Sequence, residues 1–366
     1  MPARLRVLLD ASAIADGRRD AGIGRYAREL SSALSHVDDI AVSIETPRSP
    51  PLSESRPGRF AHAQPALIRA ALRLHPDIAH GLGGEPVAGF PLSRQVVTIH
   101  DVEMWRAPAS TKLRRIALRA YAAVLVGRYR RCGALIAVSR ASADEAIATL
   151  GLEPKRVHVV PEGVSSTFSS RPELTDAEIR AAVGVEESRY VLWTGSLRSR
   201  DPRKGLDVLL AAMTRLGPNA PPLLMAGPEG EESERIRWEA TRLGLQVILS
   251  GGRSDRELAS LYRAASVVVL ASNHEGFGLP ALEAMACGAP VVATTVGNIP
   301  DLAGDVALLV PPRDPAALAG ALRMVLEDDD LAGRMRAVGP QRAAAYTWSR
   351  AAVLTADVYR RVAGRR

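Results

Sequence analysis

Cysteine, lysine and aromatic residues are scarce in this sequence of 366 residues, and long apolar runs are absent. The two cysteines, Cys132 and Cys287, argue against a disulfide framework or a four-ligand zinc site, and both are expected to be buried thiols. The longest apolar runs are far shorter than the roughly 20 residues that a membrane-spanning helix requires. The apolar run near the start is too short for a signal peptide, so we expect a cytoplasmic protein.

The net charge of +7 is confined to the first part of the chain. Residues 1–165 contain 23 Lys and Arg against 16 Asp and Glu, whereas residues 166–366 contain 24 of each kind. The richest basic segment, residues 111–131, has seven cations and no acid, interleaved with apolar residues: Lys112, Arg114, Arg115, Arg119, Arg128, Arg130 and Arg131. It fits either a sheet-covering helix with solvated arginines or a helix that contacts anionic lipid at the inner membrane face. Arginine is abundant throughout, so its number does not indicate a nucleic-acid partner.

Short β-branched and apolar runs alternate with stretches of helical period, which is the pattern of parallel sheets covered by helices on both faces. In the first half, strands are predicted at residues 5–9, 41–45, 78–80, 96–99, 135–138 and 157–160. The second half repeats the pattern at 190–193, 223–226, 247–249, 267–270, 291–293 and 307–310. The expected fold class is α/β, with two Rossmann-like domains that face each other.

Two segments interrupt this alternation. Residues 46–64 contain four prolines among serines and arginines, and we expect an exposed loop there. Residues 161–168 are turn-rich and form the expected linker. The linker separates an N-terminal domain (1–165) from a C-terminal domain (166–346). Residues 347–366 follow as a helix with Thr347 as its N-cap.

The turn after the strand at 267–270 carries the richest candidate chemistry, because ligands bind at the carboxyl ends of strands in open α/β sheets. A helix is predicted to open near Leu279, so the backbone N–H groups of Phe277, Gly278 and Leu279 would be available to an anionic or hydroxyl-rich ligand. Two carboxylates, Glu275 and Glu283, suit the hydroxyls of a sugar or ribose. A solvated helix residue and a helix-dipole partner are equally compatible with these two positions.

Two cations, Arg203 and Lys204, open a helix after the strand at 190–193 and suit a diphosphate. An exposed basic turn is the alternative, although Lys204 is one of only three lysines in the chain. Gly22 and Gly24 follow the first strand and would let the backbone approach a phosphate. Their spacing is not G-x-G-x-x-G, which disfavours an NAD enzyme. His100 ends the strand at 96–99, where it faces a ligand edge or serves as a structural histidine.

Glu275 and Glu283 lie in the segment EGFGLPALEAMACGAPVVA, which resembles the signature of the GT4-type retaining glycosyltransferases, a family with the two-domain GT-B fold. The resemblance extends over nearly the whole chain. It includes AGIGRYARELSSAL, VVTIHD, IAVSRAS, VHVVPEGV and VLWTGSLRSRDPRKGLDVLLAA.

By this resemblance, the N-terminal domain (1–165) would be the acceptor side and the C-terminal domain (166–346) the donor domain. The resemblance also implies a role for each candidate residue of the donor domain. Glu275 would contact the hydroxyls of the donor sugar, Glu283 would hold the ribose, and the amides from Phe277 to Leu279 would contact sugar and phosphates. Lys204 would bind the donor diphosphate. Many members carry an arginine where this chain has Ser196, so the second cation would be Arg203 or, less readily, Arg198. Asp301 likewise replaces a glutamate that many members carry.

In the first domain the resemblance places Gly22 and Gly24 at the phosphates and His100 near the donor sugar. Asp101 would orient His100 or the acceptor. The final helix would cross back onto the N-terminal domain. Metal-ligand spacing is absent from the candidate residues, and the family works without a bound metal, so no metal or cofactor is expected.

The predicted function is transfer of a hexosyl group from a GDP- or UDP-linked sugar to a hydroxyl acceptor with retention, and mannosyl is preferred. No carboxylate is an obvious nucleophile, so front-face departure is favoured over double displacement. A non-hydrolysing nucleotide-sugar epimerase and a non-catalytic nucleotide-sugar binding protein remain the alternatives.

Overall fold

The computed structural model describes residues 4–16, 22–47, 56–102, 112–185 and 189–364, which fall into two compact units. The first unit comprises Met1–Gly163 and Thr347–Arg366, and the second comprises Val164–Tyr346. Each unit contains a six-stranded, all-parallel sheet. The expected boundaries, after residues 165 and 346, lie within two residues of these divisions.

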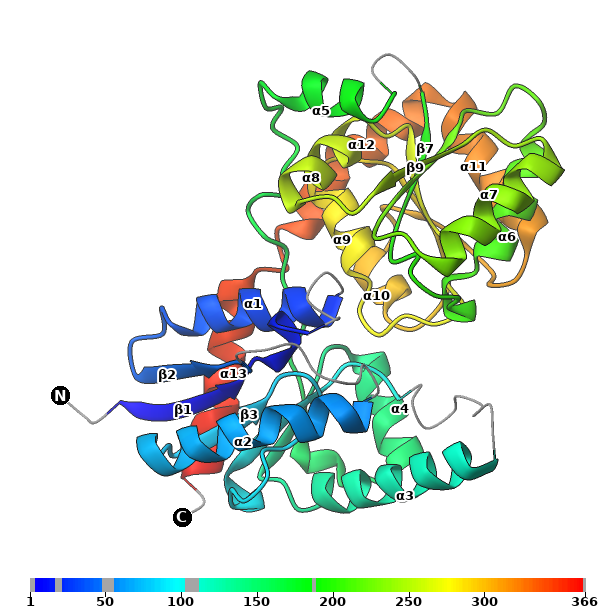
Figure 1. Ribbon diagram of the computed structural model, residues 1–366. Coiled ribbons are helices and arrows are strands. Elements are labelled where there is room, and N and C mark those ends of the chain that lie inside the picture. Colours follow the sequence, from blue (N-terminus) through cyan, green and yellow to red (C-terminus); the bar gives the residue numbers. More distant parts are fainter. Residues whose placement is uncertain (1–3, 17–21, 48–55, 103–111, 186–188, 365–366) are drawn as a thin grey trace. The chain divides into compact units, whose positions relative to one another are not determined.

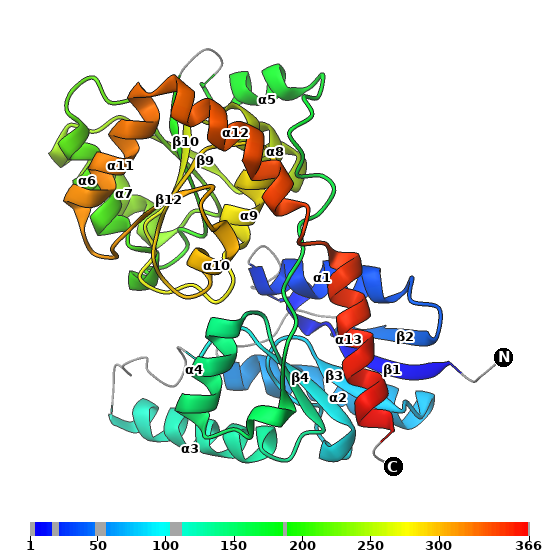
Figure 2. The ribbon, with the colours of Figure 1, turned by 180° about the vertical axis from the view of Figure 1, so that it is seen from behind.

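The first sheet has the strand order β2-β1-β3-β4-β5-β6. Helices α1 and α13 cover one face, and α2 and α3 cover the other (Figures 1 and 2). The strands are β1 (Leu5–Asp10), β2 (Ile40–Glu45), β3 (Ile78–Gly81), β4 (Gln95–Ile99), β5 (Ala134–Ala137) and β6 (Val157–Val159). The helices are α1 (Gly22–Leu34), α2 (Arg56–Leu74), α3 (Lys112–Tyr129), α4 (Arg140–Leu150) and α13 (Trp348–Ala363), with short 3-10 turns at Ser12–Ile14, Leu92–Arg94 and Pro154–Arg156.

The second sheet has the order β12-β11-β10-β7-β8-β9. Its strands are β7 (Val191–Thr194), β8 (Leu223–Ala226), β9 (Val247–Gly251), β10 (Val267–Leu270), β11 (Val291–Thr294) and β12 (Leu308–Val310). Its helices are α5 (Asp176–Ala182), α6 (Leu206–Leu216), α7 (Glu231–Leu243), α8 (Asp255–Ala264), α9 (Leu279–Ala286), α10 (Ile299–Ala303), α11 (Pro315–Glu327) and α12 (Asp329–Ala343), with the 3-10 turn η5 at Pro202–Lys204. Buried aliphatic residues of β7, β8 and β10 form the centre of its core.

All twelve predicted strands are present, but the predicted loop at residues 46–64 is wrong in its second half. Helix α2 begins at Arg56 and continues to Leu74, while residues 48–55 lie outside the described residues. Pro57 occupies the first turn of α2, where its missing N–H costs no intrahelical hydrogen bond. The proline-rich composition therefore marks the approach to a helix rather than a loop through residue 64. Helix α1 begins at Gly22, so both glycines that follow the first strand lie in its first turn.

A buried hydrogen-bond chain joins α13 to the sheet and to α1 within the first unit. The Tyr26 hydroxyl lies 2.8 Å from Thr98 Oγ1, and His80 Nε2 lies 2.9 Å from the same oxygen. His80 Nδ1 lies 2.6 Å from the Tyr359 hydroxyl of α13. Trp348 packs edge-on against Tyr26 with ring centroids 5.8 Å apart. The C-terminal helix therefore contributes polar partners to the core of the first unit as well as apolar surface.

The turn after β7 packs directly against the end of β10 in the second unit. Gly205 has φ 62°, and a Cβ at this position would lie 1.8 Å from the Ala271 carbonyl oxygen. Asn273 donates its backbone N–H to the Arg203 carbonyl at 2.6 Å and its side-chain amide to the Pro202 carbonyl at 2.9 Å. Only glycine permits this approach, which fixes η5 beside the loop that follows β10.

The first prediction concerns His80. Burial, followed by the nearby His100, lowers the pKa of His80 from 6.5 to about 3. His80 therefore takes up a proton near pH 6.5 in the unfolded chain but only near pH 3 in the folded chain. The folded state consequently loses stability as the pH falls from about 6.5 to about 3. Between pH 7.5 and 5.5 this single group removes about 1.4 kcal/mol. Urea unfolding at both pH values should show a smaller loss in His80→Asn than in wild type, and equal losses would contradict the assignment.

The second prediction concerns Gly205. In Gly205→Ala the new methyl group meets the Ala271 carbonyl, so the free energy of unfolding should fall by about 1–3 kcal/mol beyond the cost of the positive φ alone. Gly244→Ala is the matched control, because Gly244 has φ 66° and ψ 28°, close to the φ 62° and ψ 28° of Gly205, and open space around its Cβ position. Chemical denaturation of both variants measures the difference. Equal destabilisation would show that the close approach at Ala271 costs nothing.

Candidate functional site

The candidate residues of the second unit lie at the point where its strand order reverses. The sheet runs outward from the neighbouring strands β7 and β10 in opposite directions, so their carboxyl ends border the crevice where ligands bind in such folds. Lys204 lies in the turn after β7, and Glu275 lies in the loop after β10. The topology thus brings together two predicted residues that are 71 positions apart.

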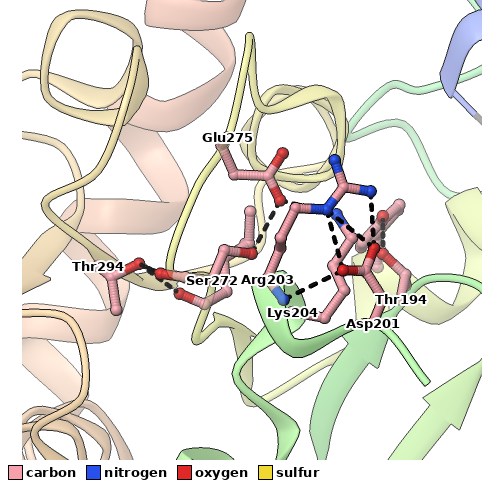
Figure 3. Close-up of polar contacts among 9 residues, drawn as sticks. Thr194, Asp201, Arg203, Lys204, Ser272, Glu275 and Thr294 are labelled. Carbon is pink, nitrogen blue, oxygen red and sulfur yellow. Dashed lines mark hydrogen bonds and ion pairs between the residues drawn. The ribbon is translucent and has the colours of Figure 1, made fainter. Parts of the chain in front are cut away.

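Lys204 and Glu275 form an ion pair at this edge (Figure 3). Lys204 Nζ lies 2.8 Å from Glu275 Oε1, and the Ser272 hydroxyl donates to the same oxygen at 2.8 Å. Burial raises the pKa of Glu275, but the Lys204 ammonium and the hydrogen bonds from Lys204 and Ser272 more than offset it, so that the pKa lies below its ordinary value. Glu275 is therefore an ionised acceptor at neutral pH.

Arg203 is held differently from its neighbour Lys204. Its guanidinium makes a bidentate contact with Asp201, with Nε–Oδ1 at 2.9 Å and Nη2–Oδ2 at 2.8 Å. Burial raises the pKa of Asp201, and the hydrogen bonds and charge of Arg203 reverse this effect, so the net shift is downward. Asp201 was missed by the sequence analysis. Its position before Pro202, as the cap of η5, is the signal that could have identified it.

The start of α9 offers backbone rather than side-chain chemistry. Gly278 is its N-cap with φ 101°, and a Cβ there would lie 2.5 Å from Ile299 Cδ1. The side chains of Phe277 and Leu279 are buried in the unit. Phe277, Gly278 and Leu279 would therefore present their backbone N–H groups, and not their side chains, to a ligand at the start of α9.

Glu283 lies inside the second unit, one helical turn along α9. It is 2% exposed, and the Tyr262 hydroxyl donates to its Oε2 at 3.3 Å. The Tyr262 hydroxyl also lies 2.8 Å from Thr194 Oγ1 at the end of β7. Tyr262 was not predicted from the sequence, and it connects Glu283 to the end of β7, the strand whose following turn carries Lys204. Tyr262 lies in α8, and no local motif marked it.

Ser196 and Arg198 both follow β7 and are exposed. The Ser196 hydroxyl accepts the backbone N–H of Arg198 at 3.4 Å, which closes a local turn. Asp301 lies in the first turn of α10, and its carbonyl accepts a hydrogen bond from Arg342.

His100 follows β4 in the first unit and has contacts on both ring nitrogens. Nε2 donates to the Leu82 carbonyl at 2.8 Å, and Nδ1 lies 3.6 Å from Glu162 Oε1. The ring also packs edge-on against Tyr26 at 4.7 Å. Glu162 is buried and was not identified from the sequence, where it formed part of the predicted linker. To donate a hydrogen bond to a ligand, His100 Nε2 would first have to release the Leu82 carbonyl.

Gly22 and Gly24 lie in the first turn of α1, where N–H groups have no intrahelical partner. Helix α1 follows β1, which neighbours β3 at the strand-order reversal of the first sheet. Asp101 follows His100 directly and is partly buried. The two glycines therefore follow a strand at the reversal of the first sheet, whereas His100 and Asp101 follow β4, the neighbour of β3.

Comparison with known proteins identifies the family. The model of the glycosyl transferases group 1 matches residues 176–342, and the model of glycosyltransferase family 4 matches residues 21–168. A D-inositol 3-phosphate glycosyltransferase of Streptomyces bingchenggensis is 32% identical, with 94% of this chain and 85% of that protein covered. An O-antigen chain mannosyltransferase B of Escherichia coli is 28% identical, with 93% and 96% covered.

Among solved structures, sucrose-phosphate synthase from Thermosynechococcus elongatus superposes with a TM-score of 0.79 at 23% identity, covering 99% of this chain and 100% of that one. This likeness supports the two-unit α/β fold. Together with the sequence relatives, it confirms the fold and family expected from the motif around Glu275 and Glu283. The chain belongs to the GT4-type glycosyltransferases and has the GT-B fold.

Proposed function

We propose that this glycosyltransferase moves a hexosyl group from a nucleoside-diphosphate sugar to a hydroxyl acceptor with retention at the anomeric carbon. The observation that carries the proposal is the 2.8 Å contact between Lys204 and Glu275 at the strand-order reversal of the second unit. A cation for phosphate oxygens and an ionised acceptor for sugar hydroxyls lie side by side there. A sugar diphosphate presents the same two kinds of group next to each other.

The pair also balances the charge of the site. Lys204 neutralises Glu275 and keeps it ionised. With a donor bound, Lys204 would stabilise the charge that grows on the departing diphosphate, and Glu275 would accept hydrogen bonds from the sugar. Ser272 holds the carboxylate in position.

Retention is proposed to proceed on a single face of the sugar. The bond from the anomeric carbon to the diphosphate oxygen breaks as the bond to the acceptor oxygen forms. The acceptor proton passes to the departing diphosphate. Glu275 is held by Lys204 and Ser272 as a hydrogen-bond acceptor, which favours a binding role over nucleophilic attack. Determination of the product anomer by NMR tests this part, and an inverted product would overturn it.

Mannose is the proposed sugar, from a GDP- or UDP-linked donor. The support is the similarity to an O-antigen chain mannosyltransferase, together with the GIGRY and TIHD segments of the sequence. We also propose that neither a metal ion nor another cofactor is required. Lys204 and the N-terminal amides of α9 supply the positive potential that a divalent cation would otherwise provide.

The third prediction tests the diphosphate role. Lys204→Ala should lower kcat/KM by roughly 10²-fold, because one preorganised donor to the leaving group is removed. Lys155→Ala is the control, since Lys155 is an exposed lysine of the first unit that pairs with Glu153. Transfer from a panel of nucleotide sugars is measured with and without EDTA. Unchanged turnover in Lys204→Ala would refute the assignment, and activity that returns only with Mg²⁺ or Mn²⁺ would refute metal independence.

Membrane contact through residues 111–131 is a separate proposal, and it rests on the exposed face of α3. Ile116 and Val124 are 56% and 64% exposed, Ala120 and Ala123 between them are also exposed, and exposed Gly127 follows in the next turn. Arg119 and Arg131 flank this apolar face and are also exposed. An apolar stripe with flanking cations suits anionic lipid better than water. Thr111 and the side chains of Lys112, Arg114 and Arg115 lie outside the described residues.

Two of the seven cations have structural contacts instead. Arg128 donates to the Val87 carbonyl at 3.0 Å, and Arg130 donates to the Leu150 carbonyl at 2.7 Å. Within the described residues, no helix is long and apolar enough to cross a membrane. The proposed contact is therefore peripheral and would place α3 beside a lipid-linked acceptor.

The fourth prediction tests this contact by vesicle co-sedimentation. The double change Arg119→Gln and Arg131→Gln should weaken binding to anionic vesicles roughly 30-fold, since each basic residue near the surface contributes about 1 kcal/mol. Arg334→Gln with Arg361→Gln removes the same charge from exposed positions on other helices and is the control. Equal loss in both pairs, or equal sedimentation with neutral and anionic vesicles, would return α3 to a purely structural role.

A further inference from the structure

A cavity of about 540 Å³ lies at the amino edge of the second sheet. Tyr190, Ser266 and Gly288 line it, and they directly precede or approach the starts of β7, β10 and β11. Lys204 and Glu275 follow the opposite, carboxyl ends of β7 and β10. Helix α9 likewise has Leu279 at its first residue and Cys287, which lines the cavity, just past its last. The cavity is therefore distinct from the candidate donor site.

Arginine dominates the charge of this cavity. Among the described residues that line it, four arginines face a single carboxylate: Arg180, Arg189, Arg263 and Arg336 against Asp176. Residues 186–188, between the lining residues Val185 and Arg189, lie outside the described residues. Asp176 is already engaged with Arg263, at 2.7 Å from Nε and 2.5 Å from Nη2. Within the described part of the lining, three guanidinium groups therefore have no carboxylate to balance them.

The contacts of these three arginines satisfy hydrogen bonds without neutralising charge. Arg336 donates to the carbonyls of Ala265 and Gly288, at 2.8 and 3.4 Å. Arg189 donates to the Leu326 carbonyl at 2.5 Å. Arg180 lies half-buried on α5, and within the described part of the chain its guanidinium has no ion-pair partner.

The electrostatic cost is clearest at Arg336. Burial lowers the pKa of its guanidinium, which means that the surroundings disfavour the positive charge. Buried charges are normally paired, and carbonyl dipoles only partly replace a counter-charge. An anion in the cavity would relieve this cost while accepting the remaining N–H donors of several arginines.

We propose that this arginine-lined cavity is a second ligand site of the chain, which binds a small molecule bearing a phosphate group. Its volume is in the range of small-molecule pockets, roughly 300–1,000 Å³, and is larger than a simple inorganic ion needs. Phosphate oxygens match the planar donor array of arginine, and Ser170 and Ser266 along the wall suit the polar remainder of a sugar phosphate. The proposal is independent of the donor site and its chemistry.

The test is calorimetric titration with inorganic pyrophosphate, and then with glucose 6-phosphate, of the full chain carrying Lys204→Ala. That background weakens the proposed donor site, and the part of the remaining binding that the cavity arginine variants remove reports on the cavity. Arg180→Glu should then weaken binding at least tenfold. Within the described residues the Arg180 guanidinium makes no hydrogen bond, so this variant should fold normally. Arg336→Gln should weaken binding similarly, provided that its circular dichroism spectrum matches that of the parent chain.

The control is Arg334→Glu, which makes the same charge change on α12 at an exposed position two residues from Arg336. It should leave the dissociation constant within twofold. No detectable binding in the Lys204→Ala background, or equal weakening by Arg180→Glu and Arg334→Glu, would overturn the proposal. Neither result would affect the donor-site assignment, which is measured by transfer activity.

Discussion

The contact between Lys204 and Glu275 is the interaction on which the candidate donor site depends. It joins the turn after β7 to the loop after β10, and it exists because these strands are neighbours where the sheet reverses its order. Gly205 allows the turn to approach the Ala271 carbonyl, and Asn273 fastens the loop to the same turn. The side chains are thus positioned by backbone packing rather than by their own flexibility.

Arg203 and Lys204 of η5 differ in how they are held, because their carboxylate partners lie in different parts of the second unit. Arg203 is held by Asp201 two residues away, so its contact is local and forms with the turn itself. Lys204 is held by Glu275, which follows a different strand, so this contact forms only when β7 and β10 are paired in the sheet. A ligand that offers phosphate to Lys204 and hydroxyls to Glu275 replaces that contact with two others of the same kind.

The first unit is organised around buried polar groups instead of a partly buried ion pair. Tyr26, Thr98, His80 and Tyr359 connect α1, two strands and the C-terminal helix in one hydrogen-bond chain. Tyr26 also packs against His100, whose ring nitrogens face Leu82 and Glu162. The C-terminal helix consequently contributes to the surroundings of His100 although it is far away in the sequence.

The sequence by itself determined the strands, the α/β class and the family. Strands were predictable because short β-branched runs bounded by turns carry a local signal, and the segment around Glu275 and Glu283 is long enough to be specific. Several contacts became visible only in the folded chain. Asp201 holds Arg203, and Glu162 lies beside His100. Tyr262 donates to Glu283, and arginines from separate elements line one cavity. Apart from the short-range Asp201 pair, these contacts join residues distant in sequence, so no local pattern encodes them. The start of α2 was only partly predictable. The prolines indicate a break in regular structure, but they do not fix the residue at which the next helix begins.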